Sequence, residues 1–259
     1  MTVQLFVFDA AADVVAAVAG RDAPWKADAV VVDWERSNKV ERQRHAVELL
    51  GIDTQIGPDT PVDLTAVTAA STVPVVCRID AWNACGPVDM LAAIEAGVSE
   101  VILPMVRRPD EVEQALEVAD GKVGVGVMIE TRAAVSAAFE IAALPISRAY
   151  LGLMDLALER RTADIFAALA DGTLDTVAEA CAGVPFGFAG LTLPGHGHPV
   201  PTRDLARDMV RVGASFTFLR RSFLSDARAD LSAGLRDIRE MLGALEPLVG
   251  RAEGGEPGR

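Results

Sequence analysis

The stretch "VGVGVMIETRAAV", residues 123–135, joins an apolar run to an Ala-rich segment, and the apolar run ends on the carboxylate of Glu130. A run of this length that carries no polar face is typical of a strand buried in a parallel sheet. Thr131, which follows, is a suitable N-cap for a helix. The stretch therefore predicts a strand followed by a helix, with an acidic side chain at the carboxyl end of the strand.

The same pattern recurs along the chain. Further apolar runs, which alternate with amphipathic segments, occupy residues 3–8, 28–33, 73–79, 100–104, 148–153, 184–190 and 214–220. Helices are expected to start near Asp9, Lys39, Pro87, Pro109, Thr131, Leu156, Pro201 and Ser222, with an extra helix near 61–70. Eight alternations in about 250 residues are typical of a (β/α)8 TIM barrel. We predict a single-domain α/β barrel over residues 1–249 and a disordered, Gly-rich tail over 250–259.

Composition limits the classes of function. Hydrophobic residues make up 51% of the 259, enough for one large core. With 24 Lys and Arg against 37 Asp and Glu, the formal charge of -13 argues against nucleic-acid binding. The cysteines, at 77, 85 and 181, are widely spaced and argue against a disulfide framework or a thiolate zinc site. Without a signal-like segment or an apolar run of membrane length, we expect a soluble, cytoplasmic protein that acts on a small molecule.

In TIM barrels the active site forms at the carboxyl ends of the strands. Polar residues that end or follow the expected strands are Asp33, Glu35, Arg78, Asp80, Glu130 and Asp155. Glu130 and Asp155 follow consecutive strands, which in a parallel sheet lie about 4.8 Å apart, so the two carboxylates could share one cation. A set of hard oxygen ligands favours Mg2+ or Mn2+.

The metal would bind a 2-oxo acid through its carboxylate and keto oxygens and would stabilise an enolate as a Lewis acid. Arg78 would add positive charge and N–H donors at the same developing oxyanion. Structural alternatives stay open at this point. Asp155 could be a helix N-cap, and Arg78 could form a rim ion pair with Asp33 or Asp80.

Three further groups of residues are candidates near this site. Asp33 and Glu35 could orient metal-bound water, or could form ion pairs with Arg36 or Arg78. Trp34 and Trp82 lie close to proposed site residues in the sequence and could line the substrate pocket. His196 and His198, in the "GHGH" of residues 195–198, could shuttle a proton, bind a metal or have no role.

The runs "VVVDWERSNK", "VVCRID", "VILPMV", "VMIETRAAV" and "YLGLMDLAL", in this order between about residues 28 and 160, resemble the HpcH/HpaI aldolase and citrate lyase beta-subunit family of the phosphoenolpyruvate/pyruvate barrel superfamily. The resemblance implies a Mg2+-dependent carbon–carbon lyase or aldolase. It matches Glu130 and Asp155 to the metal ligands of the family and Arg78 to its substrate- and enolate-binding arginine. It also implies a homotrimer or homohexamer, and the amphipathic segment 221–249 could pack on its own barrel or on a neighbouring subunit.

The sequence departs from the family at positions that bear on the substrate. Arg36 stands where the aldolase branch has a proton-transferring His, and Met105 stands where the CoA-handling branch has a Lys. We therefore expect a lyase or aldolase that acts through a metal-bound pyruvate- or oxaloacetate-like enolate. The alternatives are a citryl-, malyl- or citramalyl-type acyl-CoA lyase, with an acyl-CoA as an additional partner, or a catalytically weakened barrel with a binding or accessory role.

Overall fold

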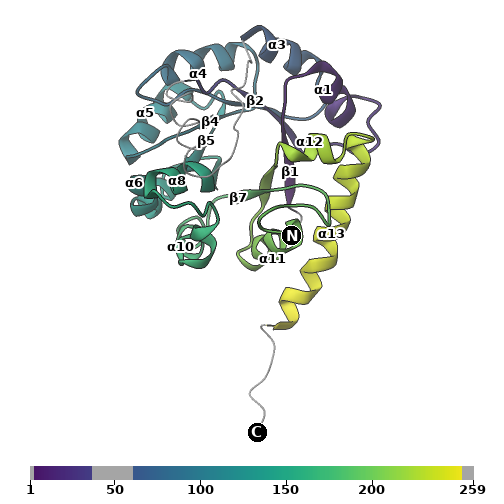
Figure 1. Ribbon diagram of the computed structural model, residues 1–259. Helices are drawn as coiled ribbons and strands as arrows, with labels where there is room; N and C mark the ends of the chain where they lie inside the picture. Colours follow the sequence, from purple (N-terminus) through teal and green to yellow (C-terminus); the bar gives the residue numbers. More distant parts are fainter. Residues whose placement is uncertain (1–2, 37–60, 253–259) are drawn as a thin grey trace.

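The computed structural model describes residues 3–36 and 61–252, and within them eight strands form a closed parallel barrel (Figure 1). The strands are β1 (Gln4–Phe8), β2 (Ala29–Asp33), β3 (Val75–Arg78), β4 (Glu100–Leu103), β5 (Gly124–Ile129), β6 (Arg148–Leu151), β7 (Phe186–Leu191) and β8 (Phe216–Leu219). Each strand pairs with its sequence neighbours, and β8 pairs with β1. The predicted (β/α)8 barrel is confirmed.

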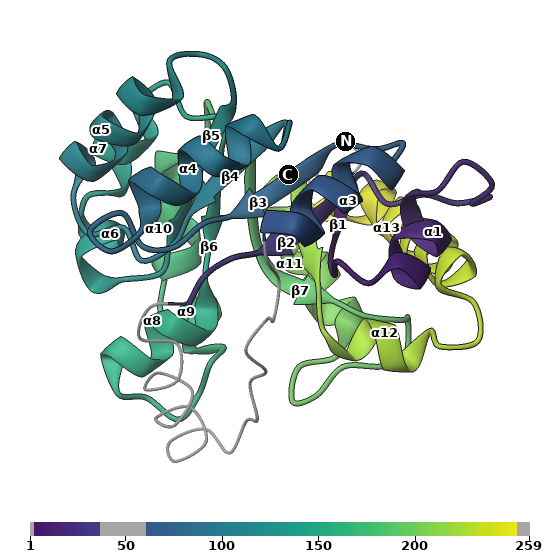
Figure 2. The ribbon, with the colours of Figure 1, turned by 90° about the horizontal axis from the view of Figure 1, so that it is seen from above.

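Helices surround the strands on the outside, as the view from above shows (Figure 2). They are α1 (Ala12–Ala19), α3 (Pro61–Ala70), α4 (Gly86–Glu95), α5 (Pro109–Ala119), α6 (Arg132–Ser136), α7 (Ala138–Ala142), α8 (Leu153–Arg160), α9 (Ala167–Ala170), α10 (Thr173–Ala180), α11 (Thr202–Arg211), α12 (Ser222–Asp226) and α13 (Leu231–Ala252). The extra helix expected near 61–70 is confirmed as α3. The helix expected near Lys39 lies outside the described residues.

Several boundaries differ from the prediction by one to three residues, such as the start of α1 at Ala12 and not near Asp9, and two of them bear on the site and the tail. The sixth strand ends at Leu151 and α8 already begins at Leu153, although the helix was expected near Leu156. The backbone N–H of Gly152 still donates to the carbonyl oxygen of Ile129 at 3.1 Å, and the chain then turns into the helix. At the other end, α13 runs to Ala252, so the first residues of the expected tail are helical.

The side chains that face the barrel axis form an aromatic-rich inner cluster. The alternation of strand side chains sends every second residue inward. The buried members of this cluster are Phe6, Ala29, Val31, Val76, Ile102, Met128, Tyr150, Phe216 and Phe218. The residues between them point outward into a larger apolar layer beneath the helices. The polar residues Asp33, Arg78 and Glu130 continue the inward-facing series at the carboxyl ends of β2, β3 and β5.

The long C-terminal helix packs on its own barrel. Helix α13 contacts α1 and α11, and it buries Leu235, Ile238, Met241, Leu242 and Leu245. This placement answers the question that the amphipathic segment left open, since its apolar face covers the helices of the same chain. Across the described ranges, none of the helices has the length and apolarity needed to cross a bilayer.

Candidate active site

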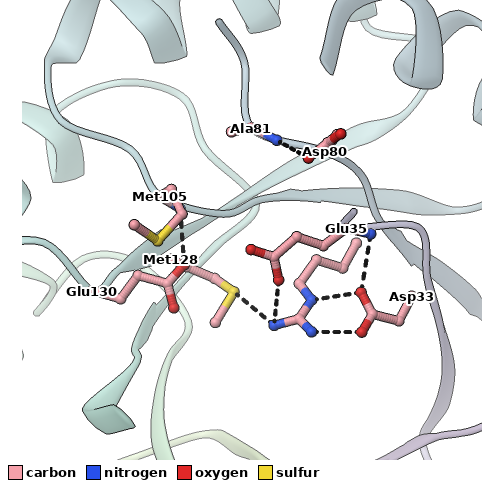
Figure 3. Close-up of polar contacts among 8 residues, drawn as sticks. Asp33, Glu35, Asp80, Ala81, Met105, Met128 and Glu130 are labelled. Carbon is pink, nitrogen blue, oxygen red and sulfur yellow. Dashed lines mark hydrogen bonds and ion pairs between the residues drawn. The ribbon is translucent and has the colours of Figure 1, made fainter. Parts of the chain in front are cut away.

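Arg78 and Asp33 form the central ion pair at the barrel mouth. They end neighbouring strands and face each other in the register of β2 and β3. The Nε and Nη2 atoms of Arg78 lie 2.9 Å and 2.6 Å from the two carboxylate oxygens of Asp33, a bidentate arrangement (Figure 3). The Nη1 atom lies 3.3 Å from a carboxylate oxygen of Glu35. Of the alternatives for these residues, the structure therefore shows the ion pairs of Asp33 and Glu35 with Arg78.

The guanidinium of Arg78 remains charged although it is buried. Burial alone would lower the pKa of Arg78, but the carboxylates of Asp33 and Glu35 outweigh this effect and hold the pKa well above its ordinary value. The guanidinium also lies over the ring of Phe8, 5.1 Å from its centroid. A guanidinium has five N–H groups; Nη1 also approaches the Sδ of Met128 at 3.9 Å, so one N–H, on Nη2, stays available for a ligand.

Glu130 is buried at the carboxyl end of β5, 1% exposed. Its Oε1 accepts a hydrogen bond of 2.8 Å from the backbone N–H of Met105, whose φ of 55° lies in the left-handed region (Figure 3). Burial first, and then the charges of Asp155 and Glu35, raise the pKa of Glu130 to about 8, while Arg78 and the N–H of Met105 oppose the rise. Glu130 is therefore held next to like charges that disfavour its ionised form.

Asp155 does not end a strand, which corrects the expected geometry. It lies in the first turn of α8, because the helix begins at Leu153. Its carboxylate still lies close enough to Glu130 to raise the pKa of that residue. The two acids therefore approach each other from a strand end and a helix start, and not from two strand ends about 4.8 Å apart.

The acids at the barrel mouth outnumber the arginine between them. We call Asp33, Glu35, Arg78, Glu130 and Asp155 the mouth site. Four carboxyl groups against one guanidinium leave excess negative charge in a buried place, and hard oxygen donors of this kind suit Mg2+. Within the described ranges no three or more His, Cys, Asp or Glu side chains are grouped as a metal site, so an ion here would depend on the two acids, water and substrate.

The tryptophans and Arg36 lie away from the mouth site. Trp34 is 1% exposed and packs in the outer apolar layer, since it follows the inward-facing Asp33 by one residue. Trp82 packs in the same layer, and its Nε1–H donates to Gln114 at 3.0 Å. Arg36 pairs with Asp89 on α4 at 2.8 Å. Both tryptophan side chains belong to the outer apolar layer, which leaves them outside the proposed substrate pocket.

His196 and His198 lie on the loop between β7 and α11, and both are exposed. Gly195 and Gly197 beside them have positive φ values of 87° and 104°. A Cβ on Gly197 would lie 2.8 Å from the backbone nitrogen of Thr202, so this glycine lets the loop fold closely onto the start of α11. A role for either histidine in proton transfer or metal binding stays a prediction.

Gly152 is a site residue that the motif analysis missed. A Cβ on this residue would lie 2.6 Å from the Cβ of Glu130 and 2.5 Å from its Oε2. Only the absence of a side chain at Gly152 leaves Glu130 its place in the barrel. The sequence feature that could have identified Gly152 is its position directly after an apolar strand and three residues before Asp155.

Comparisons with known proteins place this barrel among solved structures. No protein-family model and no curated protein matches the chain. An HpcH/HpaI aldolase/citrate lyase family protein from Burkholderia cenocepacia J2315 has a TM-score of 0.65 and 19% identity, covering 92% of this chain and 95% of its own. The citrate lyase beta subunit from M. tuberculosis, complexed with oxaloacetate and magnesium, has a TM-score of 0.59 and 17% identity, with 93% and 97% covered.

An HpcH/HpaI aldolase from Desulfitobacterium hafniense DCB-2 is similar to the same extent. It has a TM-score of 0.58 and 16% identity, with 92% of this chain and 93% of that chain covered. These similarities extend over almost the whole barrel. The similar proteins are HpcH/HpaI aldolases and citrate lyase beta subunits, the two groups that the sequence motifs resemble. The chain therefore has the fold of the HpcH/HpaI aldolase and citrate lyase beta-subunit structures.

Proposed function

We propose that the protein is a Mg2+-dependent carbon–carbon lyase or aldolase that acts on a 2-oxo acid bound at the mouth site. The observation that carries the proposal is the burial of Glu130 beside the charges of Asp155 and Glu35, which raises its pKa to about 8. A divalent cation would offset this crowding of negative charge. The magnesium and oxaloacetate of the similar M. tuberculosis structure support the same assignment.

Glu130 and Asp155 would hold the ion. The N–H of Met105 and the absence of a side chain at Gly152 fix Glu130 in position. When bound, Mg2+ would supply Lewis-acid charge at the keto oxygen of the substrate. Burial of the site strengthens every electrostatic contact within it.

Arg78 would bind the substrate and stabilise the negative charge that develops on its oxygen. Asp33 fixes the guanidinium through two hydrogen bonds, so the remaining N–H of Nη2 is oriented before the substrate arrives. Glu35 lies against the same group and limits its movement. Preorganised donors of this kind contribute to the rate because they need no reorientation during the reaction.

A second candidate is an acyl-CoA lyase that uses the same mouth site. A further M. tuberculosis structure with a TM-score of 0.61 and 18% identity holds magnesium, acetoacetate and coenzyme A, and it favours this candidate. The two candidates differ in one ligand. Calorimetric binding of acetyl-CoA to the Mg2+-loaded protein would support the acyl-CoA lyase, and binding of pyruvate without acetyl-CoA would support the aldolase.

The proposed function is tested by enolate formation in Mg2+-loaded protein. Wild-type protein should exchange the methyl protons of pyruvate for deuterium in D2O, measured by NMR, and should bind oxalate only when Mg2+ is present. Glu130→Gln and Asp155→Asn should each weaken Mg2+-dependent oxalate binding on the order of 100-fold, because each removes an expected ligand. Glu140→Gln, an exposed carboxyl on α7, is the matched control and should leave both measurements unchanged.

Two results would overturn the proposal. One is oxalate binding that is equally tight in EDTA and in Mg2+. The other is proton exchange that persists at the wild-type rate in Glu130→Gln. Circular dichroism of each variant separates loss of a ligand from loss of the fold.

A further inference from the structure

Arg220 is a second arginine that faces the barrel mouth. It directly follows β8, and Phe216 and Phe218 of that strand belong to the inner cluster. Because inward-facing side chains recur every second residue, Arg220 continues the inward series at the carboxyl end of the strand. Its backbone N–H donates to the carbonyl oxygen of Leu191 at 2.8 Å, which keeps β8 paired with β7 up to this point.

The guanidinium of Arg220 is held by backbone carbonyl groups and one ring. Its Nε donates to the oxygen of Gly190 at 2.8 Å. Its Nη1 and Nη2 approach the oxygens of His198 and Val200 at 3.4 Å, beyond the usual range of a strong hydrogen bond. The ring of Phe166 lies 5.5 Å from the guanidinium carbon. These contacts fix the orientation of the side chain and leave two of its five N–H groups for a ligand.

Arg220 has no carboxylate partner in the described part of the chain, although it is half-buried. Burial lowers its pKa, and the charge of Asp226 opposes this effect without forming an ion pair. The Asp226 carboxylate instead accepts a hydrogen bond from the hydroxyl of Thr192 at 2.5 Å. The other strand arginines, Arg78 and Arg148, both have carboxylate partners.

A chain of aromatic rings runs from Arg78 of the mouth site to Tyr150. Arg78 lies over Phe8, Phe8 lies 4.8 Å from Phe218, and Phe218 lies 4.2 Å from Tyr150. The ionisation of Tyr150 responds to Glu130, to Arg78 and to Arg220, so Tyr150 lies within electrostatic range of all three. Around the barrel, β1 and β2 separate β8 from β3, and β6 and β7 separate it from β5. Arg220 therefore lies across the aromatic floor from the mouth site.

We propose that Arg220 binds the distal carboxylate of a dicarboxylic 2-oxo acid whose keto-acid end lies at the mouth site. This inference rests on the proposed function, since it assumes that a 2-oxo acid is the substrate. A partly desolvated guanidinium without an anion is unfavourable, and a carboxylate accepts hydrogen bonds from two of its N–H groups at once. Arg220 would thus select dicarboxylic over monocarboxylic substrates.

The first test compares 2-oxo acids of equal carbon number in the Mg2+-loaded protein. Calorimetry would measure oxaloacetate against 2-oxobutyrate, and 2-oxoglutarate against 2-oxopentanoate. In the wild type the dicarboxylic member of at least one pair should bind about tenfold tighter or more. Arg220→Gln should abolish this advantage and leave the affinity of the monocarboxylic member unchanged.

Two control variants separate the effect of the positive charge on dicarboxylate binding from the effects of its position and of folding. Arg220→Lys keeps the positive charge without the planar pair of donors and should keep only part of the advantage. Arg228→Gln, an exposed arginine eight residues later, makes the same charge change and should behave as wild type. Thermal unfolding of Arg220→Gln without ligand measures what the loss of the contacts with Gly190 and Phe166 costs, and affinities are compared at temperatures where both proteins are folded.

A second measurement tests the binding of a dicarboxylate by Arg220 in the absence of the metal. In EDTA, succinate should raise the unfolding temperature of the wild type more than butyrate does, and Arg220→Gln should abolish the difference. If dicarboxylates have no advantage in either assay, or keep it in Arg220→Gln, the role of Arg220 is overturned. If the succinate effect depends on Arg220 but no 2-oxo acid binds with Mg2+, the proposed function alone fails.

Discussion

Two partly buried arginines lie at opposite ends of the barrel, and their neighbours differ in charge. Arg78 ends β3 at the mouth, where it meets Asp33 and Glu35 and lies within electrostatic range of Glu130. Arg148 begins β6 at the base and pairs with Glu100, which begins β4; its Nε lies 2.7 Å from both carboxylate oxygens. We call Glu100 and Arg148 the base pair.

The base pair carries no net charge. The guanidinium of Arg148 lies over the rings of Phe6 and Phe216, at 4.6 Å and 4.8 Å, and the Ser147 hydroxyl donates to Glu100. One positive and one negative charge balance each other inside an apolar shell. The mouth site carries an excess of carboxyl groups, which the proposed cation would offset. The two ends of the barrel therefore differ in charge balance more than in burial, and the proposed function lies at the end that is not balanced.

The largest expected effect comes from breaking the base pair. Arg148→Met should lower the free energy of unfolding by about 3–5 kcal/mol, because Glu100, whose side chain is 5% exposed, would stay buried without its charged partner. Urea unfolding in EDTA would measure the loss. Magnesium-dependent oxalate binding by the folded fraction should be unchanged.

Two variants sharpen this result. Glu100→Gln combined with Arg148→Met removes both charges and should recover much of the lost stability. Arg207→Met breaks an exposed ion pair with Asp204 and should cost less than about 1 kcal/mol. If the double variant were as unstable as Arg148→Met alone, lost packing and not the unpaired charge would explain the effect.

An intermediate effect is expected at the glycines that make room for each site. A Cβ at Gly152 would collide with Glu130, and a Cβ at Gly126 would lie 3.0 Å from the Cγ of Arg148 and from Oε1 of Glu100. Gly152→Ala and Gly126→Ala should each cost about 1–3 kcal/mol through overpacking. Only Gly152→Ala should weaken Mg2+-dependent oxalate binding as well, because it displaces the expected metal ligand.

Calorimetry and urea unfolding on the same two variants separate the sites. Equal loss of oxalate affinity in both variants would mean that the base pair also shapes the mouth site. Full affinity in Gly152→Ala would mean that Glu130 can move without consequence, which contradicts its assignment as a ligand.

Much of the fold could be predicted from the sequence because the strands are buried on both faces. Such strands read as continuous apolar runs, and the helix at 61–70 is separated from its neighbours by clear boundaries. The start of α8 was predicted too late because Leu153 continues the apolar run of β6. Hydrophobicity alone cannot distinguish the last residue of a buried strand from the first residue of a buried helix.

The charged residues of the mouth site could be predicted because each interrupts an apolar run. Their pairing could not, since Asp33, Asp80 and Glu35 were equally available to Arg78 until the strand register placed Asp33 opposite it. The position of Trp34 was available from the sequence, because it follows an inward-facing residue by one and must point outward. The partners of Glu100 depend on glycines of β5, a relationship that only the closed barrel reveals.

The most direct measure of the charge excess at the mouth is the pH dependence of stability in EDTA, which changes in the smallest steps, one pH unit at a time. Below about pH 4.5, the Glu130 carboxyl is protonated in both the folded and the unfolded chain and contributes nothing. Between pH 4.5 and its folded-state pKa of about 8, the unfolded chain ionises while the folded chain keeps the proton, so stability falls as pH rises. The fall is at most about 1.4 kcal/mol per pH unit.

Glu130→Gln should remove this fall. In urea unfolding, the free energy of unfolding of this variant should therefore rise steadily relative to that of the wild type from pH 5 to pH 8. Glu140→Gln should follow the wild type throughout. Added Mg2+ should stabilise the wild type most at the upper end of the range, because the ion binds the ionised carboxylate. Parallel curves for wild type and Glu130→Gln in EDTA would show that Glu130 ionises without cost. The mouth site would then be as well balanced in charge as the base pair, and no excess negative charge would be left for a cation to offset.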